Sequence, residues 1–158
     1  SMGVNRASLY DTFGDKRSLF IATLKHYDNT QKKPTLKLTA ENRSPLETIR
    51  FLFDSLVEEA LDRNRRDGCF LVNSMLERAP HDEEVSDIIT KSFADVQKYF
   101  RDTIRKGQQA GEISKDVDAG ETAPILFAAL IGIRVLSRGK PRKATVRSIA
   151  DQAVSLLG

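Results

Sequence analysis

The sequence predicts an all-α protein in which a partial helix-turn-helix is joined to a helical bundle, and three observations support this. No useful length of sequence alternates apolar and polar residues, and no Asn-Gly or Asp-Gly turn joins two apolar runs, so strand signals are almost absent. Apolar residues instead recur at steps of three and four along most of the chain. Helix-capping signals separate these runs. The 158 residues are enough to bury one sizeable core.

The first helices follow from two local signals. Asp15 is expected to cap a helix that runs from Lys16 to about Gln31. Its inner face is predicted to carry Leu19, Phe20, Thr23, Leu24 and Tyr27. The polar segment 32–43, which contains Pro34, is expected to be a loop.

The middle of the chain has two strong helix starts. Ser44-Pro45-Leu46-Glu47 is a capping box with proline at the first helical position, and it begins a helix that ends near Leu61. A short helix over 69–79 is expected to stop at Pro80. Asp82-Glu83-Glu84 then places negative charge at the start of a helix of about 28 residues, which Gly111 is expected to end.

The last two helices predict a homodimer. Asp118 and Glu121 begin a helix that is apolar on nearly every side, and Gly139 and Pro141 separate it from the final helix. A helix that is apolar all round must be covered all round, and a second subunit is the simplest cover in a domain of this size. The expected interface residues are Ile125, Ala129, Ile133, Leu136, Val146, Ile149, Ala153, Val154 and Leu157.

Composition excludes several classes of protein. The net charge of +3 is too small to establish a polyanionic partner. Cys69 is the single cysteine, which rules out an internal disulfide and points to a reducing cytoplasm. His26 and His81 lack the neighbours of a catalytic or metal site, and the apolar stretch 125–133 is too short to span a bilayer. We therefore expect a cytoplasmic protein that is not an enzyme, needs no cofactor or metal and does not enter a membrane.

The opening stretch GVNRASLYDTFGDKRSLF has the pattern of a short helix, a tight turn and a second helix. Val4, Leu9 and Phe13 would form the buried side, as a helix in the major groove requires. On spacing alone, a plain helical hairpin with accidental polar residues is equally good. The candidate DNA contacts are Asn5, Arg6, Ala7, Ser8, Tyr10 and Lys16.

Residues 3–27 resemble the recognition helix and the fourth helix of the TetR family of bacterial transcriptional regulators. The shared features are the glycine-valine start, the serine-leucine-tyrosine triplet and the phenylalanine-glycine-x-lysine turn followed by leucine-phenylalanine. Asp11 departs from the pattern, because the family often has a neutral or basic residue there. The resemblance extends as a helical pattern over essentially the whole chain.

This resemblance implies that two further helices of the DNA-binding domain precede Gly3. Residues 3–27 would then be the remnant of that domain, and residues 28–158 the ligand-binding and dimerisation domain. The implied function is a repressor that a small-molecule or thiol-reactive effector releases from operator DNA, with DNA binding expected only of the full-length protein. The alternative is a helical module that binds a small molecule or a protein and does not bind DNA.

The stretch Gly68-Cys69-Phe70-Leu71-Val72-Asn73 holds a candidate redox sensor. Cys69 is expected at a helix start, where the macrodipole stabilises a thiolate, and Arg65 and Arg66 are close in sequence. The stretch resembles a TetR subgroup that includes electrophile and redox sensors. The alternative is that Cys69 is a small apolar residue that fills a gap.

An effector pocket is expected between the helices of the larger domain. Asn73 and Arg134 are the better candidates, because a polar group on an apolar helix face needs a partner. The full set of predicted pocket residues is Phe53, Val57, Cys69, Asn73, Leu76, Phe93, Phe100, Phe127 and Arg134.

Overall fold

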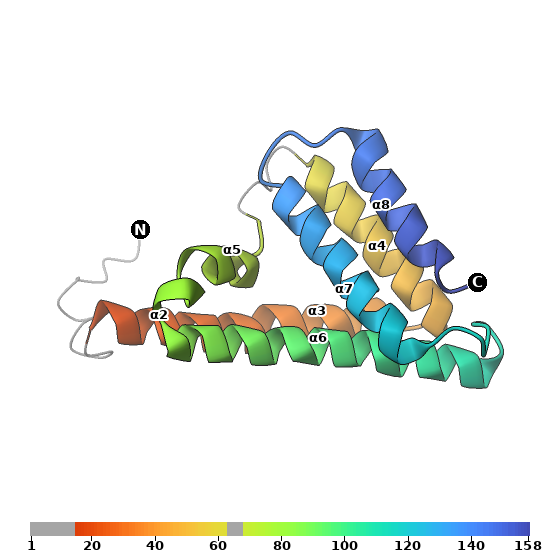
Figure 1. Ribbon diagram of the computed structural model, residues 1–158, viewed down its shortest axis with the longest axis horizontal. Helices are drawn as coiled ribbons and strands as arrows, with labels where there is room; N and C mark the ends of the chain where they lie inside the picture. Colours follow the sequence, from red (N-terminus) through yellow and green to blue (C-terminus); the bar gives the residue numbers. More distant parts are fainter. Residues whose placement is uncertain (1–14, 63–67) are drawn as a thin grey trace.

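The computed structural model describes residues 15–62 and 68–158, and all regular structure in these ranges is helical. The elements are α2 (Lys16–Tyr27), the π-helical η1 (Asp28–Lys32), α3 (Lys33–Ala40), α4 (Pro45–Leu61), α5 (Phe70–Glu77), the 3₁₀-helical η2 (Ala79–His81), α6 (Glu83–Ala110), α7 (Ala119–Leu136) and α8 (Lys143–Ser155). In Figure 1, α2 and α3 lie alongside α6, while α4, α7 and α8 form a bundle over the carboxyl-terminal half of α6.

Local hydrogen bonds set the helix starts, as the sequence predicts. The Ser44 hydroxyl accepts a hydrogen bond from the amide of Glu47 at 3.4 Å, and the Glu47 carboxylate accepts one from the amide of Ser44 at 2.9 Å. Aspartates cap three other helices, and Gly111 ends α6 with a left-handed φ of 75°. The capping aspartates are Asp15 for α2, Asp82 for α6 and Asp118 for α7.

The expected loop over residues 32–43 is wrong, because most of this segment is helical. α2 continues through η1 into α3, which ends only at Ala40. Pro34 lies in the first turn of α3, where the missing amide hydrogen costs no intrahelical bond. The wider π-helical turn comes directly before it, so the segment passes the proline without ending. The predicted division at residues 27 and 28 therefore falls inside a continuous helical segment.

Two apolar cores hold the helices together. The larger core lies between α4, α6, α7 and α8, and Phe53, Phe100, Leu126 and Ile133 are among its fully buried residues. The smaller core joins α2 to α5 and to the start of α6. Its buried members are Ile21, Leu24, Leu71, Val85 and Ile89.

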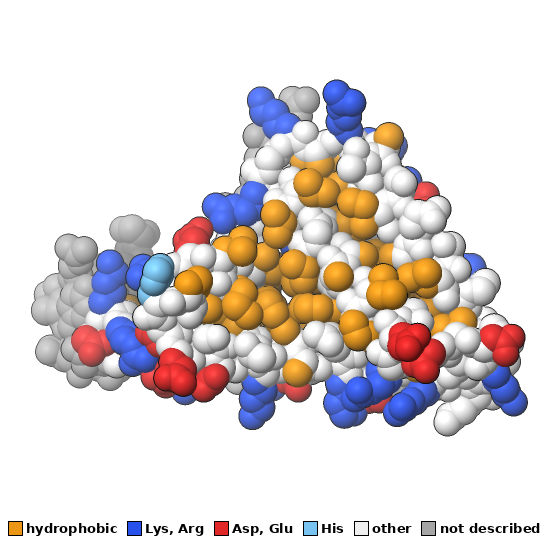
Figure 2. All heavy atoms as spheres, in the orientation of Figure 1, with side chains coloured by type: hydrophobic (Ala, Val, Ile, Leu, Met, Phe, Trp, Pro, Cys, Tyr) orange, Lys and Arg blue, Asp and Glu red, His pale blue; other side chains and the backbone are white. Residues whose placement is uncertain are grey.

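One side of α7 is not covered within the subunit. Leu126 and Ile133 are fully buried, but Ile125 is 52% exposed, and Val135 and Leu136 are also exposed. Figure 2 shows hydrophobic side chains gathered over the middle of this face, with most charged side chains toward its edges. By length and composition α7 could cross a membrane, yet it packs against α4, α6 and α8 as a core helix does.

Candidate functional site

The amino-terminal candidates lie almost entirely outside the described residues. Asn5, Arg6, Ala7, Ser8 and Tyr10 all precede residue 15. Lys16, the first residue of α2, is exposed, as a residue that contacts phosphate must be. The adjacent Arg17 donates hydrogen bonds to both carboxylate oxygens of Asp82 at 2.7 and 2.9 Å, and so ties the start of α2 to the start of α6.

A cavity of about 530 Å³ lies between α2–η1–α3, α4, α5, α6 and α7. This volume is in the range of small-molecule binding sites. The described walls are polar and apolar in similar measure. In the apolar part, Phe93 of α6 and Phe127 of α7 pack with ring centroids 5.2 Å apart. The lining residues are Tyr27, Gln31, Lys32, Thr35, Leu36, Leu52, Leu56, Glu59, Gly68, Cys69, Leu71, Val72, Phe93, Val96, Phe127, Leu130, Ile131 and Arg134.

Four of the predicted pocket residues line this cavity: Cys69, Phe93, Phe127 and Arg134. The other five do not. Phe53, Val57 and Phe100 are buried in the larger core, because their faces of α4 and α6 meet neighbouring helices directly. Leu76 is 62% exposed, and Asn73 lies on α5 with its amide oxygen near Gly68, outside the lining.

Sequence reasoning missed the wall formed by the first helical segment. Gln31, Lys32, Thr35 and Leu36 all line the cavity. The sequence predicts a loop from residue 32, so Lys32, Thr35 and Leu36 could not be assigned to a helix face. Gln31 falls in the predicted helix but not on its predicted inner face. The spacing of Tyr27, Gln31 and Thr35 at four-residue steps is the signal that could have found them.

Cys69 lies in the wall directly after Gly68 and close to Tyr27. Gly68 has a φ of 70°, and a Cβ at this residue would come within 3.0 Å of the Arg138 side chain, so the approach to Cys69 requires glycine. Cys69 is the N-cap residue of α5 and is partly buried. Burial first, and then the neighbouring Cys69, raises the pKa of Tyr27 to about 12. Tyr27 therefore keeps its proton throughout the physiological pH range.

Two ion pairs supply the charge in the cavity wall. Arg134 of α7 donates to Glu59 of α4 at 2.5 Å, and both side chains are about a third exposed or less. Lys32 contacts Asp28 at 2.6 Å and donates to the hydroxyl and carbonyl oxygens of Ser92 at 2.8 and 3.0 Å. Burial opposes ionisation of Asp28, but hydrogen bonds from Lys32 and Ser92 outweigh it and lower the pKa of Asp28.

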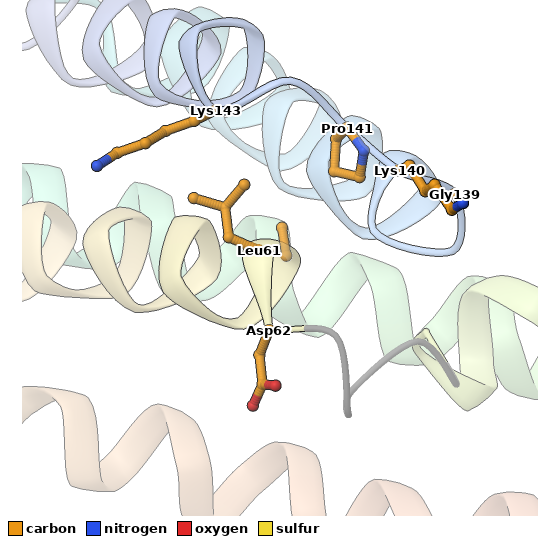
Figure 3. A pocket seen from close by; sticks show the side chains of 7 residues that line it. Leu61, Asp62, Gly139, Lys140, Pro141 and Lys143 are labelled. Atoms are coloured by element: carbon orange, nitrogen blue, oxygen red, sulfur yellow. The ribbon is translucent and has the colours of Figure 1, made fainter.

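A second pocket lies where α4 ends, directly beyond Glu59 of the cavity wall (Figure 3). It measures about 450 Å³, and its lining comes from the end of α4 and from the loop between α7 and α8. Asp62 points away from this loop, and Lys143 extends along the pocket edge. Its described lining includes none of the predicted site residues and no aromatic side chain, so the cavity around Cys69 and Arg134 is the candidate functional site.

Burial corrects the predicted dimer interface. Ile133, Val146, Ala153 and Leu157 are at most 4% exposed inside the subunit, because they face the larger core, and cannot form an outer surface. Ile125 and Leu136 are exposed, and Ala129, Ile149 and Val154 are half-buried. Val135 and Leu156, which were not predicted, are also exposed.

Comparison with known proteins agrees with this architecture. The family model "Tetracyclin repressor-like, C-terminal domain" matches residues 45–152. A relative from Bacillus subtilis (strain 168), the uncharacterized HTH-type transcriptional regulator YezE, is 26% identical over 157 residues, which are 99% of this chain and 81% of the relative.

Solved structures share the fold. A cysteine mutant of the TetR family transcriptional regulator CifR, complexed with 26-bp operator DNA, superposes with a TM-score of 0.82 at 24% identity. The match covers 98% of this chain and 81% of that one. A TetR family regulator from Cytophaga hutchinsonii gives a TM-score of 0.84 at 20% identity, over 98% of this chain and 77% of that one.

The all-helical fold and the sequence motif of the first residues are those of a helix-turn-helix transcriptional regulator. The family model spans more than half of the chain, and the protein belongs to the TetR family of transcriptional regulators.

Proposed function

We propose that the protein is a homodimeric transcriptional repressor and that an effector entering the cavity weakens its binding to operator DNA. It acts in the cytoplasm, by binding rather than by catalysis. Residues 3–27 belong to the DNA-reading part, and residues 28–158 provide the effector site and the dimer contacts. Tyr27 belongs to both parts, because it lies in the helix that leads from the motif and also lines the cavity.

The observation that carries this proposal is that one helical segment both follows the DNA-reading part and lines the cavity. The continuous segment α2–η1–α3 begins at Lys16, a candidate phosphate contact, and its later turns form one wall of the cavity. The segment α2–η1–α3 can lie at more than one distance from α6 and α7. An effector that binds one of these arrangements more tightly shifts the equilibrium toward that arrangement. This shift would move the DNA-reading part, because the cavity wall and the candidate phosphate contact Lys16 belong to one helical segment.

A homodimer would cover the exposed apolar side of α7. Ile125, Val135 and Leu136 lie on α7, and Leu156 follows α8. An apolar patch of this kind marks an interaction surface in a soluble protein. We place the interface on these residues together with Ala129, Ile149 and Val154. A protein that stays monomeric in sedimentation at micromolar concentration would exclude this assembly.

Cys69 is the proposed point of attack for a thiol-reactive effector. Its position in the cavity wall gives a ligand access to the sulfur. In an addition to a quinone or enal, the sulfur forms a bond to the electron-poor carbon, the carbon–carbon π electrons move toward the carbonyl oxygen, and the thiol proton is transferred to the product. The added group would remain in the cavity and act as a tethered effector.

The test uses full-length protein and a fluorescent DNA duplex taken from upstream of its own gene. We expect salt-sensitive binding by fluorescence anisotropy, followed by release of DNA on addition of a quinone. Cys69→Ser should bind DNA equally well and resist the quinone. Release from both proteins would make the effector non-covalent and return Cys69 to a packing role. A protein with no sequence-selective DNA binding would refute the repressor function itself.

A further inference from the structure

We infer that the cavity selects electrically neutral ligands that carry a hydrogen-bond acceptor on an apolar body, and that the Arg134–Glu59 ion pair enforces this selection. The inference rests on the proposed function in one respect, namely that the cavity is the effector site. It adds the chemical class of the effector and names the residues that exclude the charged classes.

Every charged side chain in the described lining is already neutralised by the protein. These side chains are Lys32, Glu59 and Arg134. Arg134 and Glu59 pair across the wall at 2.5 Å, from α7 to α4. Lys32 pairs with Asp28 at 2.6 Å, one turn earlier in the same helical segment, and Asp28 does not line the cavity. The described wall therefore offers a bound ligand no net charge from these two pairs.

Binding in this cavity is unfavourable for anionic and cationic ligands alike. A carboxylate that approached Arg134 would also approach the Glu59 carboxylate, and an ammonium group that approached Glu59 would meet Arg134. Both would lose part of their hydration against the apolar part of the wall, which includes Leu52, Phe93 and Phe127. Without a counter-ion of its own, a charged ligand does not regain that loss.

A neutral acceptor meets suitable donors in the same wall. Tyr27 lines the cavity with a hydroxyl that stays protonated, because burial and the neighbouring Cys69 raise its pKa to about 12. Arg134 has five N–H donors, so one bond to Glu59 leaves further donor capacity on the guanidinium. A carbonyl, ester or ether oxygen accepts from such groups without bringing a charge into the cavity.

The experiment compares three probes that share one ring system and do not react with thiols: methyl 2-naphthoate, 2-naphthoate and 2-naphthylmethylammonium. The protein contains no tryptophan, so the anisotropy of naphthalene fluorescence reports binding without overlapping protein emission. We expect the ester to bind at least tenfold more tightly than either charged probe. Equal or tighter binding of a charged probe, or binding of none of the three, would overturn the inference.

Glu59→Gln tests the residue that enforces the selection. This variant removes the carboxylate and leaves the Arg134 charge in place, so 2-naphthoate should gain at least tenfold in affinity while the ester changes less than threefold. Glu59 is partly exposed, and the variant is expected to fold, which circular dichroism checks. An unchanged preference for the ester would overturn the assignment to this pair.

The matched control is Asp54→Asn. Asp54 also lies on α4 and also pairs with an arginine of a neighbouring helix, Arg147 of α8, but it does not line the cavity. The control makes the same change in charge and should leave all three affinities unchanged. Ile131→Phe fills part of the cavity from α7 and should weaken binding of the ester. Unweakened binding would place the probe elsewhere and overturn the inference.

The two proposals fail in different assays. If quinone releases the DNA but the naphthalene series shows no preference for the neutral probe, the repressor function stands and the charge selection is wrong. If the ester is preferred in the parent and the preference is lost in Glu59→Gln, but no effector alters DNA binding, the charge selection stands and the proposed regulation is wrong.

Discussion

The larger and smaller cores differ in how completely helices enclose them. In the larger core, α4 is packed against α6, α7 and α8, and the rings of Phe53 and Phe100 stack with centroids 6.2 Å apart. In the smaller core, and among the described residues, α2 packs against η1, α5 and the first part of α6. The cavity lies where the two cores meet, since Leu52 and Leu56 belong to the larger core and Leu71 to the smaller one.

The larger core is therefore expected to provide most of the stability, and the smaller core to permit movement of α2. Hydrophobic stabilisation grows with the apolar area removed from water, so the larger core carries most of the free energy of folding. The smaller core attaches the segment that leads from the DNA-reading part, and fewer contacts hold it. Regions with fewer buried contacts open at lower free energy, so we expect α2 to move before the bundle does.

The largest expected effect comes from breaking the larger core. Phe100→Ala removes a fully buried ring that packs against Phe53 and should lower the free energy of unfolding by about 3–5 kcal/mol. Urea titration followed by circular dichroism measures this loss. Leu38→Ala is the control, because Leu38 is 59% exposed and should change stability by no more than about 0.5 kcal/mol. A small loss in Phe100→Ala would contradict the assignment of stability to this core.

A smaller and more local effect is expected in the smaller core. Leu24→Ala removes a fully buried side chain of α2, at a cost of about 2–3 kcal/mol, because substitutions at the edge of a structure relax more readily. Hydrogen exchange should show faster exchange of α2 amides while the amides of α4 and α8 keep their protection. Equal acceleration in all three helices would show that the two cores unfold as one unit.

The hydrogen-bonded cluster at η1 should contribute less and depend on pH. Asp28→Asn weakens contacts to Lys32 and Ser92 and should cost about 1–2 kcal/mol at neutral pH, since the Asp28 and Lys32 side chains are at most 15% exposed and Asn keeps one acceptor oxygen. The pKa of Asp28 is lowered below its usual 3.8, so its contribution is present above that pH and disappears as the pH falls through the folded pKa. Urea titrations at neutral and strongly acidic pH should therefore converge for parent and variant. A constant difference would exclude this origin.

The exposed ion pairs between α2 and α6 should have the smallest effect. Arg17→Gln removes contacts to Asp82 and to Glu84, which hold the pKa of Asp82 below its usual value. We expect the melting temperature to fall slightly at low ionic strength and not to change at about 1 M salt, where screening is nearly complete. Lys98→Gln is the control, because it breaks an ion pair within α6 alone. A salt-independent loss in Arg17→Gln would indicate packing rather than charge.

Much of the secondary structure could be predicted because its causes are local. The Ser44 capping box and the Asp82 and Asp118 caps each depend on residues within three positions, and all three begin helices where expected. Pro34 misled the prediction, since proline both ends helices and fits their first turn. A local pattern cannot distinguish these two outcomes when a π-helical turn comes before the proline.

The cavity was only partly predictable from sequence. Cys69, Phe93, Phe127 and Arg134 were found, but Phe53 and Phe100 occupy equally apolar helix positions and are packed core. Helical periodicity identifies the inner face of a helix. It does not say whether a neighbouring helix fills the space in front of that face, because this depends on helix crossings between residues far apart in the chain.

The sequence alone thus specified all the α-helices except α3, most of their ends and the helix-turn-helix resemblance, because capping and periodicity act over a few residues. Packing of distant helices fixed the rest. It buried Ile133 and left Ile125 exposed on the same apolar helix, and it brought Glu59 to Arg134 across 75 positions of sequence. Both outcomes depend on which helices meet, and that is decided by the area buried over the whole molecule.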